Sequence, residues 1–221
     1  MRIVFAKPRE EHLRMIYEWF NRDSYVIRHE KTPISEEEFL EIIGNWTRPR
    51  GLMFVAILEH DTGEDVVGYF AFEGWDIRNR NAFCHLYLVP KWRGQGIGAM
   101  VLEEAFRIFF IEKNMNKLKA LIPEPFDRIR RLIEKYGCEN EGILKKELYF
   151  KGKYINIVYY GYTRAMYHKY LKEKQDGMAI DSRIGSNGSW DWDSSSWSRS
   201  AESQPEENQD NVGESPAAVE G

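Results

Sequence analysis

The sequence has 221 residues, of which 43% are hydrophobic, 14% aromatic and 30% charged. This length fits one domain with appendages or two very small domains, and the apolar fraction is sufficient for a packed core. No apolar run approaches the ~20 residues of a membrane-spanning helix, and the apolar part of the N-terminus is too short for a secretory signal. The two cysteines, Cys84 and Cys138, have neither disulfide-like nor metal-like spacing, which is typical of a reducing compartment. We therefore expect a cytoplasmic protein with no membrane partner and no metal.

The charge is unevenly distributed along the chain. Residues 175–221 contain two basic and ten acidic residues, a net charge of −8, whereas the preceding residues have 29 basic and 25 acidic ones, a net charge of +4. The acidic segment is rich in Ser and Gly and has almost no aliphatic residues to bury, so we predict that it is disordered. Its three tryptophans, Trp190, Trp192 and Trp197, form either a docking motif for a protein partner or part of a plain linker.

Hydrophobic periodicity predicts the elements of the first half of the chain. Apolar residues at i, i+3, i+4 and i+7 from Leu13 predict a helix that opens at Pro8. Ser35 and Glu38 are the ends of a capping box that starts a second helix. The polar residues 61–65 form a turn between two strands of a hairpin. In order, we predict one strand, two helices and three strands, over residues 3–7, 8–20, 35–43, 51–60, 66–75 and 81–89.

The second half of the chain alternates helices with strands. A long apolar helix follows directly on a cluster of glycines, Pro123 stops a short strand, and Gly137 ends the next helix. These elements and the final hairpin occupy residues 97–109, 118–122, 126–136, 143–150 and 154–163. Together they predict an α+β fold, a mixed sheet flanked by helices. We place this domain at residues 1–164, followed by a helical or irregular extension at 165–174.

A glycine-rich turn joins the strand ending at Val89 to the long helix. Glycines at positions 94, 96 and 98 have no side chains, so their backbone N–H groups can approach a ligand closely. The N-terminus of the following helix adds the positive end of its dipole. Such a turn suits an anion, in particular a pyrophosphate, and Arg93 is placed to add a charge-assisted contact or to cap the turn.

Three phosphate-loop patterns compete for this segment. A nucleoside-triphosphate loop requires Gly-Lys-Ser/Thr, but Gly98 is followed by Ala99 and Met100. A dinucleotide loop requires Gly-x-Gly-x-x-Gly early in a β-α-β unit, whereas this turn has a different glycine spacing and follows a hairpin. The third pattern, Arg/Gln-x-x-Gly-x-Gly/Ala, is met by Arg93, Gly96 and Gly98. It resembles the coenzyme A pyrophosphate loop of the GNAT superfamily of acyl-CoA N-acyltransferases; a glycine-rich turn without a ligand is the alternative.

The resemblance extends over residues 1–164, because the order of elements is similar to that of the superfamily. The segment Glu-Lys-Tyr-Gly-Cys at 134–138 and the hairpin after it resemble the ribosomal-protein-acetyltransferase (RimJ/RimL-like) branch. The resemblance implies a mainly antiparallel sheet and acetyl-CoA as co-substrate. It also implies that the backbone around Leu88 pairs with the pantetheine arm and polarises the thioester carbonyl. The implied coenzyme A contacts are Leu88, Val89, Arg93, Gly94, Gln95, Gly96, Ile97 and Gly98.

Two prolines fit this picture. Pro123 and Pro125 cannot continue a hydrogen-bonded ladder, so the strand ending at Ile122 should separate from the strand ending at Val89. The resemblance implies that the pantetheine arm enters through this gap.

The chain departs from the family where catalytic groups are expected. Ile133 stands where the family frequently has a tyrosine acid, and Phe126 or a neighbour replaces the asparagine that commonly starts the same helix. The remaining candidates for proton transfer are His85, Glu73 and Tyr136, and Tyr87, which shares a strand face with His85.

His85 is the preferred base, because an imidazole titrates near neutral pH. Its alternative role is that of a core histidine bonded to a backbone carbonyl. His85 and Leu88 have opposite parity on their strand, so we expect a β-bulge between them that turns His85 toward the thioester.

Two functions from different classes follow. The first is an N-acetyltransferase that moves acetyl from acetyl-CoA to an amine of a protein N-terminus, a lysine or a small molecule. The second is a non-catalytic or weakly catalytic protein that keeps the acyltransferase fold, for example a viral accessory or virion component, since viruses of bacteria carry such divergent proteins. We do not expect nucleic-acid binding, because the basic residues of the core form solvated faces. These residues also have room to contact coenzyme A phosphates; they are Arg128, Arg130, Arg131, Lys145 and Lys146.

Overall fold

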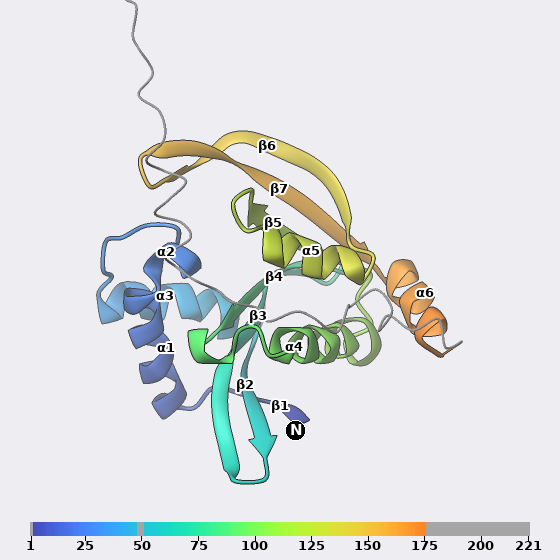
Figure 1. Ribbon diagram of the computed structural model, residues 1–221, viewed down its shortest axis with the longest axis horizontal. Helices are drawn as coiled ribbons and strands as arrows, with labels where there is room; N and C mark the ends of the chain where they lie inside the picture. The colour runs from blue at the N-terminus through green and yellow to red at the C-terminus, as the bar shows by residue number, and fades with distance from the viewer. Residues whose placement is uncertain (1, 48–50, 176–221) are drawn as a thin grey trace, which may run out of the picture. The chain divides into compact units, whose positions relative to one another are not determined.

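Seven strands form one mixed sheet in the computed structural model, which describes residues 2–47 and 51–175 (Figure 1). The strands are β1 (Arg2–Ala6), β2 (Leu52–His60), β3 (Gly63–Asp76), β4 (Asn81–Leu88), β5 (Lys117–Pro123), β6 (Glu139–Phe150) and β7 (Lys153–Thr163). Their order in the sheet is β1-β2-β3-β4-β5-β7-β6, and all neighbours are antiparallel except β4 and β5. The predicted α+β class with a mainly antiparallel sheet is confirmed.

The helices begin where the sequence signals place them, with one addition. They are α1 (Glu10–Arg22), α2 (Ser24–Ile27), α3 (Glu36–Thr47), α4 (Ile97–Phe106), α5 (Asp127–Lys135) and α6 (Arg164–Gln175). The predicted capping box is present before α3: the Ser35 N–H donates to Glu38 Oε2 at 2.8 Å, and the Glu38 N–H donates to Ser35 Oγ at 3.1 Å. The four-residue α2 was not predicted, because it is too short to carry a periodic signal.

The long helix predicted after the glycines is divided in two. Regular α-helix α4 ends at Phe106, and a π-helical segment continues it from Arg107 to Glu112. Most of the apolar residues stay buried through both parts, although Ile111 is 45% exposed, so the hydrophobic pattern alone does not reveal the change of winding.

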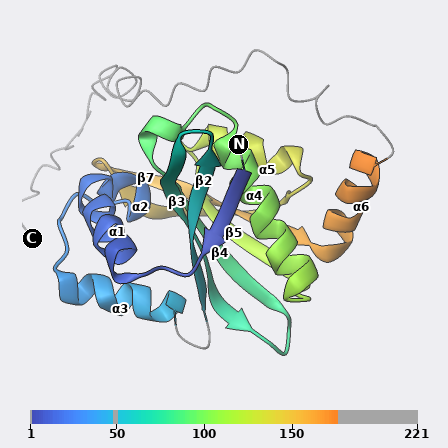
Figure 2. The ribbon, with the colours of Figure 1, turned by 90° about the horizontal axis from the view of Figure 1, so that it is seen from below.

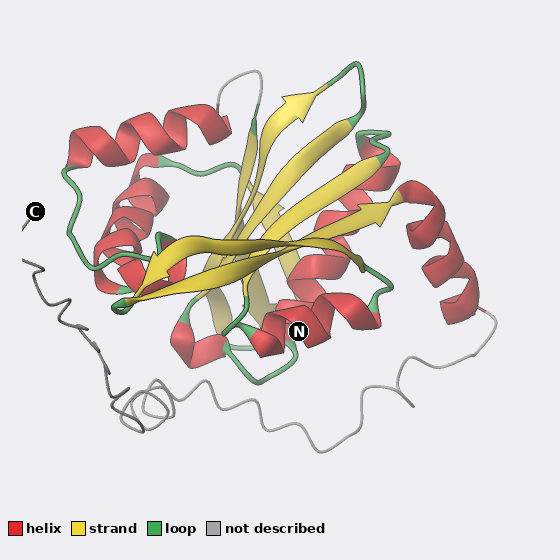
Figure 3. Ribbon diagram, turned by 90° about the horizontal axis from the view of Figure 1, so that it is seen from above, coloured by secondary structure: helices red, strands yellow, loops and turns green. Residues whose placement is uncertain are grey.

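Helices α1–α3 cover one face of the sheet, and α4 and α5 cover the other (Figures 2 and 3). Side chains on β4 alternate between these two layers, as the pleat of a strand requires. Tyr87 packs on Trp19 of α1 and on Tyr69 of β3, with ring centroids 5.4 and 5.6 Å apart. Leu86 and Leu88 pack in the opposite cluster, which includes residues of α4.

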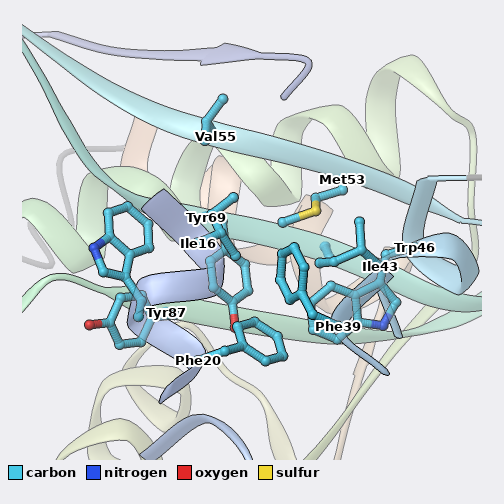
Figure 4. Close-up of a cluster of buried hydrophobic side chains, with 11 residues drawn as sticks. Ile16, Phe20, Phe39, Ile43, Trp46, Met53, Val55, Tyr69 and Tyr87 are labelled. Atoms are coloured by element: carbon cyan, nitrogen blue, oxygen red, sulfur yellow. The ribbon is translucent and has the colours of Figure 1, made fainter. Parts of the chain in front are cut away.

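An aromatic cluster fixes α1 and α3 on the first face (Figure 4). The rings of Phe20 and Phe39 meet edge to face at 5.2 Å, and Trp46 lies 5.8 Å from Tyr69. Buried aromatic pairs of this kind add to the hydrophobic stabilisation. This packing matters for the site described below, because Trp46 lies at its edge.

Strands β4 and β5 separate along their length. They are paired in parallel only over Asn81–Phe83 and Lys117–Lys119, whereas β4 stays paired with β3 as far as Leu88. The predicted separation is therefore present. It begins four residues before Pro123, which is itself opposite Ile157 of β7, so the prolines end β5 and do not start the separation.

Helix α6 packs on the core through two tyrosines. Tyr167 and Tyr170 are 4% and 5% exposed, and the Tyr167 ring lies 5.1 Å from Phe110. The Tyr170 hydroxyl donates to Glu103 Oε1 of α4 at 2.7 Å. Disorder and tryptophan docking were predicted for residues 175–221. Apart from Gln175, these residues lie outside the part of the chain that the structure describes.

A chain truncated after Gln175 should keep its melting temperature within a few degrees, because the removed sequence has almost no aliphatic residues to bury. A chain truncated after Thr163 should lose at least about 10 °C, since burial of Tyr167 and Tyr170 is lost with α6. Differential scanning calorimetry of both truncations checks this expectation. Equal losses in the two would contradict it.

Candidate active site

The glycine turn between β4 and α4 has the backbone conformation that its sequence requires. Gly94 and Gly96 have φ angles of +83° and +80°, in the left-handed region that favours glycine. Gly96 is the N-cap of α4, and its carbonyl oxygen accepts the N–H of Ala99 at 3.0 Å. Within the described part of the chain, none of the backbone N–H groups of residues 94–98 donates a hydrogen bond to another residue. The turn thus presents a row of unsatisfied donors at a helix N-terminus, which suits an anion.

Arg93 stabilises this turn from the β4 side. Its Nε donates to the carbonyl oxygen of Leu88 at 2.7 Å, and its guanidinium lies 5.5 Å from the centre of the Tyr87 ring. Burial lowers the pKa of Arg93. Of the two roles considered for Arg93, these contacts correspond to the capping of the turn.

The edge of β4 that faces β5 is open at its C-terminal end. The Val89 N–H donates to the carbonyl oxygen of Val67 on the β3 side at 2.8 Å. Because successive residues of a strand direct their backbone groups to opposite sides, the N–H of Leu88 is directed away from β3. No residue of β5 pairs with β4 beyond Phe83, so this N–H lies on an unpaired edge next to the glycine turn.

His85 and Glu73 form a hydrogen-bonded pair on the face covered by α1–α3. The distance between His85 Nε2 and Glu73 Oε2 is 2.6 Å, and the imidazole stacks on the Trp46 indole with centroids 4.9 Å apart. Both side chains reach solvent, with 39% and 41% of their surfaces exposed. The hydrogen bond from His85 lowers the pKa of Glu73, with a smaller contribution from Trp46, so Glu73 is a carboxylate at neutral pH.

This pairing fixes the tautomer of a neutral His85. When Nε2 carries the proton and donates it to Glu73, the lone pair is on Nδ1. Among the described residues, no hydrogen bond to His85 Nδ1 is present. The pair therefore has the form of a general base oriented by a carboxylate.

The β-bulge expected between His85 and Leu88 is absent, and that prediction was wrong. Pairing of β4 with β3 is regular from Phe83 to Leu88, and the bulge lies on β3 between Glu73 and Asp76. His85 and Leu88 consequently lie on opposite faces of the sheet. A bulge on β4 is not required for a thioester at Leu88 to be reached from the His85 face. The Leu88 N–H lies in the plane of the sheet, at an open edge that both faces border.

The structure does not bring Tyr136 together with His85 and Glu73. Tyr136 is 3% exposed, its ring packs 5.4 Å from Phe106, and its hydroxyl donates to the Ala99 carbonyl oxygen at 3.3 Å. Burial raises the pKa of this phenol well above its usual range. Tyr136 thus anchors the first turn of α4 from the other face of the sheet.

Tyr87 is also engaged in a structural contact. Its hydroxyl donates a short hydrogen bond to Asp23 Oδ2, at the junction of α1 and α2. Burial is the main cause that raises the pKa of Tyr87, and the bond to Asp23 adds to it. Tyr87 therefore links β4 to α1 and α2 and has no proton to release near neutral pH.

His29 lies near the His85–Glu73 pair and was not singled out from the sequence. It follows α2, has a φ of +63°, and its ring lies 5.7 Å from Phe126 at the start of α5. A non-glycine residue in the left-handed region is uncommon and often marks a functional position. Burial lowers the pKa of His29 and the nearby His85 lowers it further, while the hydrogen bond with the Tyr25 carbonyl oxygen raises it in part. No local sequence signal distinguishes His29, because its backbone conformation is set by the packing around it.

His29 should make the protein less stable in acid. Its folded-state pKa is lowered, so the unfolded chain binds more protons as the pH falls through about 6.5, and stability decreases there. Asn tolerates a positive φ, so His29→Asn should remove this term without straining the backbone. The melting temperature of the variant relative to wild type should rise by a few degrees between pH 8 and pH 5.5. Parallel pH curves in thermal denaturation would contradict the assignment.

The two thiols of the chain are poorly reactive in this structure. Cys84 and Cys138 are both free, and burial raises the pKa of Cys84 to about 12, which makes it a poor nucleophile. Residues 2–47 and 51–175 contain no group of three or more His, Cys, Asp or Glu side chains that could hold a metal ion.

The helices of the described residues are too short or too polar to cross a membrane.

Comparison with known proteins identifies the family. A family model described as an acetyltransferase (GNAT) domain matches residues 2–139. The chain therefore belongs to the GNAT acetyltransferase family, which confirms the resemblance inferred from the glycine turn at that level.

Relatives and structural neighbours agree with this assignment. The chain is 27% identical over 111 residues to the SPbeta prophage-derived uncharacterized N-acetyltransferase YokL of Bacillus subtilis strain 168, a match that covers 50% of this chain. The match spans 61% of that relative, less than two thirds of its length.

Solved structures of spermidine N-acetyltransferase SpeG from Vibrio cholerae have the same fold. A chimera of SpeG with hSSAT has a TM-score of 0.67 at 19% identity, covering 77% of this chain and 99% of that one. The complex of the Vibrio cholerae enzyme with CoA and spermine also has a TM-score of 0.67, at 18% identity, covering 76% and 98% of the two chains. At these identities the likeness establishes the fold only.

Proposed function

We propose that this protein transfers an acetyl group from acetyl-CoA to an amine. The observation that carries the proposal is the row of unsatisfied N–H groups at residues 94–98, next to the open edge of β4. Two requirements of a coenzyme A thioester are an anion site for its phosphates and a backbone edge for its amide-containing arm. The SpeG neighbour bound to CoA and spermine supports the same assignment for a chain of this fold.

The residues of the turn match the chemistry of the coenzyme A phosphates and pantetheine arm. The N–H groups of Gly94, Gln95, Gly96, Ile97 and Gly98 would hold the pyrophosphate, and Arg93 would keep the turn in place. Leu88 and Val89 would present the strand edge to the pantetheine arm. Acetyl-CoA supplies the activated acyl group when it is bound. A hydrogen bond from the Leu88 N–H to the thioester carbonyl would stabilise the negative charge that develops there.

His85 is the proposed base. Its Nδ1 takes a proton from the attacking amine, while Glu73 holds the imidazole through Nε2 and stabilises the imidazolium that forms. Trp46 restricts the ring to one plane by stacking. In this arrangement Glu73 is a positioning residue. It becomes the alternative base, acting through a water molecule, if His85 proves dispensable.

One observation favours a second candidate, an acyltransferase-fold binding protein with little or no turnover. Ile133 is 7% exposed and packs in the core, so the helix α5 offers no tyrosine there to return a proton to the thiolate. Tyr136, the nearest tyrosine in sequence, is committed to the Ala99 carbonyl. In this second candidate function, the chain binds acetyl-CoA without transferring the acetyl group, as a viral accessory or virion component.

Two narrower assignments belong to the same proposal. The segment at 134–138 supports the RimJ/RimL-like branch, whose motif it resembles. The similarity to a prophage-derived relative supports a bacteriophage origin for this chain.

An acetyl-transfer assay separates the two functions. The full chain is incubated with acetyl-CoA and, separately, with spermidine, a lysine-containing peptide and a peptide with a free N-terminus. Release of free thiol together with an acetylated product in mass spectrometry supports the enzyme. Binding of acetyl-CoA without thiol release from any amine supports the second candidate. Failure to bind acetyl-CoA would overturn both.

A further inference from the structure

The loop before α5 and the glycine turn meet at one edge of the sheet. Strands β4 and β5 are parallel, so their C-terminal ends lie at the same edge. The glycine turn follows β4, and α5 begins at Asp127, four residues after the end of β5. Helices α4 and α5 both lead away from that edge on the same face of the sheet (Figures 1 and 2). The two helices thus begin on either side of the place where β4 and β5 separate.

Contacts between the helices set the level of α5 relative to the glycine turn. A Cβ atom on Gly98 would lie 3.9 Å from Leu132 Cδ2, so Leu132 is level with the first turn of α4. Arg128 precedes Leu132 by four residues, about 6 Å of helix rise, and lies on the same helix face. This places Arg128 within about one helical turn of the contact between Leu132 and Gly98.

The Arg128 guanidinium has an unmet hydrogen-bonding requirement. Its Nη1 is buried, and the described residues provide no hydrogen-bond partner for it. The described residues provide no ion pair for Arg128 either. Arg130 also has an unpaired Nε, but its Nη2 is paired with Asp127. A buried donor on a charged group is costly to leave unpaired, and native proteins seldom do so without a ligand or water in place.

We propose that Arg128 contacts a phosphate group of coenzyme A and supplies the full positive charge that the glycine turn lacks. The inference rests on the proposed function. The turn offers neutral backbone donors, and Arg93 is already bonded to the Leu88 carbonyl. An arginine beside the turn would form charge-assisted, paired contacts with phosphate oxygens.

Titration calorimetry with coenzyme A tests the proposal without reference to activity. Arg128→Met should weaken binding about tenfold to a hundredfold, the loss of one charge-assisted contact. Its melting temperature without ligand should be unchanged or higher, because the variant removes a buried unpaired donor. Arg128→Lys keeps the charge but not the fork of donors, and it should recover part of the affinity. The matched control is Arg78→Met, an exposed arginine in the turn between β3 and β4, at the opposite end of β4 from the glycine turn, and it should change affinity less than about threefold.

Dephospho-coenzyme A identifies the phosphate. If Arg128 contacts the 3′-phosphate, wild type should prefer coenzyme A and Arg128→Met should bind both ligands equally. If it contacts the pyrophosphate, the variant should lose affinity for both by the same factor. Unchanged affinity in a folded Arg128→Met overturns this inference alone. If Arg128→Met does not fold, unchanged affinity in Arg128→Lys has the same meaning. Absence of binding by wild type overturns the proposed function and this inference with it.

Discussion

Replacing Gly96 by valine should abolish the thermal stabilisation that acetyl-CoA confers on the wild-type chain. Gly96 has a φ of +80°, and a Cβ added to it would meet no atom of the protein within 4 Å. The space that the side chain would occupy is therefore the open side of the turn, where the pyrophosphate is proposed to lie. A β-branched residue at this φ also costs about 1–2 kcal/mol of folding free energy. The shift in melting temperature at saturating acetyl-CoA is the measurement.

Gly152→Val is the matched control for this variant. Gly152 has a φ of +84° and likewise no atom within 4 Å of an added Cβ, but it lies in the turn between β6 and β7. The two substitutions should lower the melting temperature of the ligand-free protein by similar amounts. Only Gly96→Val should lose the response to acetyl-CoA. A full response in Gly96→Val would refute the phosphate-binding role of the turn.

Replacing His85 by glutamine should lower the rate of acetyl transfer by roughly a hundredfold or more, the usual contribution of a general base. Glutamine can still donate a hydrogen bond to Glu73, so the variant should fold and bind acetyl-CoA with unchanged affinity. The effect should therefore fall on kcat and not on the dissociation constant of acetyl-CoA. Steady-state rates with the amine that is acetylated give kcat. Calorimetry gives the dissociation constant of acetyl-CoA.

The pH dependence of the rate gives an independent test of His85. The acidic limb of a pH–rate profile reports protonation of the catalytic base, so His85→Gln should lose the acidic limb that wild type shows. Glu73→Gln is the paired variant, and we expect a loss of about tenfold from a positioning residue. A larger loss in Glu73→Gln than in His85→Gln would make Glu73 the base and His85 its partner.

The glycine turn could be predicted from sequence because its information is local. A glycine at position 96 implies a backbone conformation that other residues rarely adopt, and its place between a strand and a helix implies a row of unsatisfied donors. Periodicity likewise predicted the strands and four of the five longer helices, since each buries one face or one stripe, whereas α6 was expected only as a helical or irregular extension. The separation of β4 from β5 was predicted, but its cause was not. The prolines lie at the end of β5 and not where the two strands begin to separate.

The catalytic side could be predicted only in part, because it depends on contacts between distant segments. His85 and Glu73 were each singled out as candidates, but their hydrogen bond depends on the register of β3 with β4 and on a bulge after Glu73. Gly74, which has a φ of +61° and directly follows Glu73, marks that bulge, whereas a bulge was expected on β4. His29 and Trp46 reach the site through the loop after α2 and through the packing of α3, so neither carries a sequence signal of its role.

Calorimetric titration of the full chain with acetyl-CoA tests the central claim most directly. The row of donors at residues 94–98 predicts saturable binding at one site per chain. It also predicts that free coenzyme A binds, because the two ligands share the phosphates and the pantetheine arm that the turn and the β4 edge are proposed to hold. Absence of a binding heat with both ligands, at concentrations up to the millimolar range, would contradict the account.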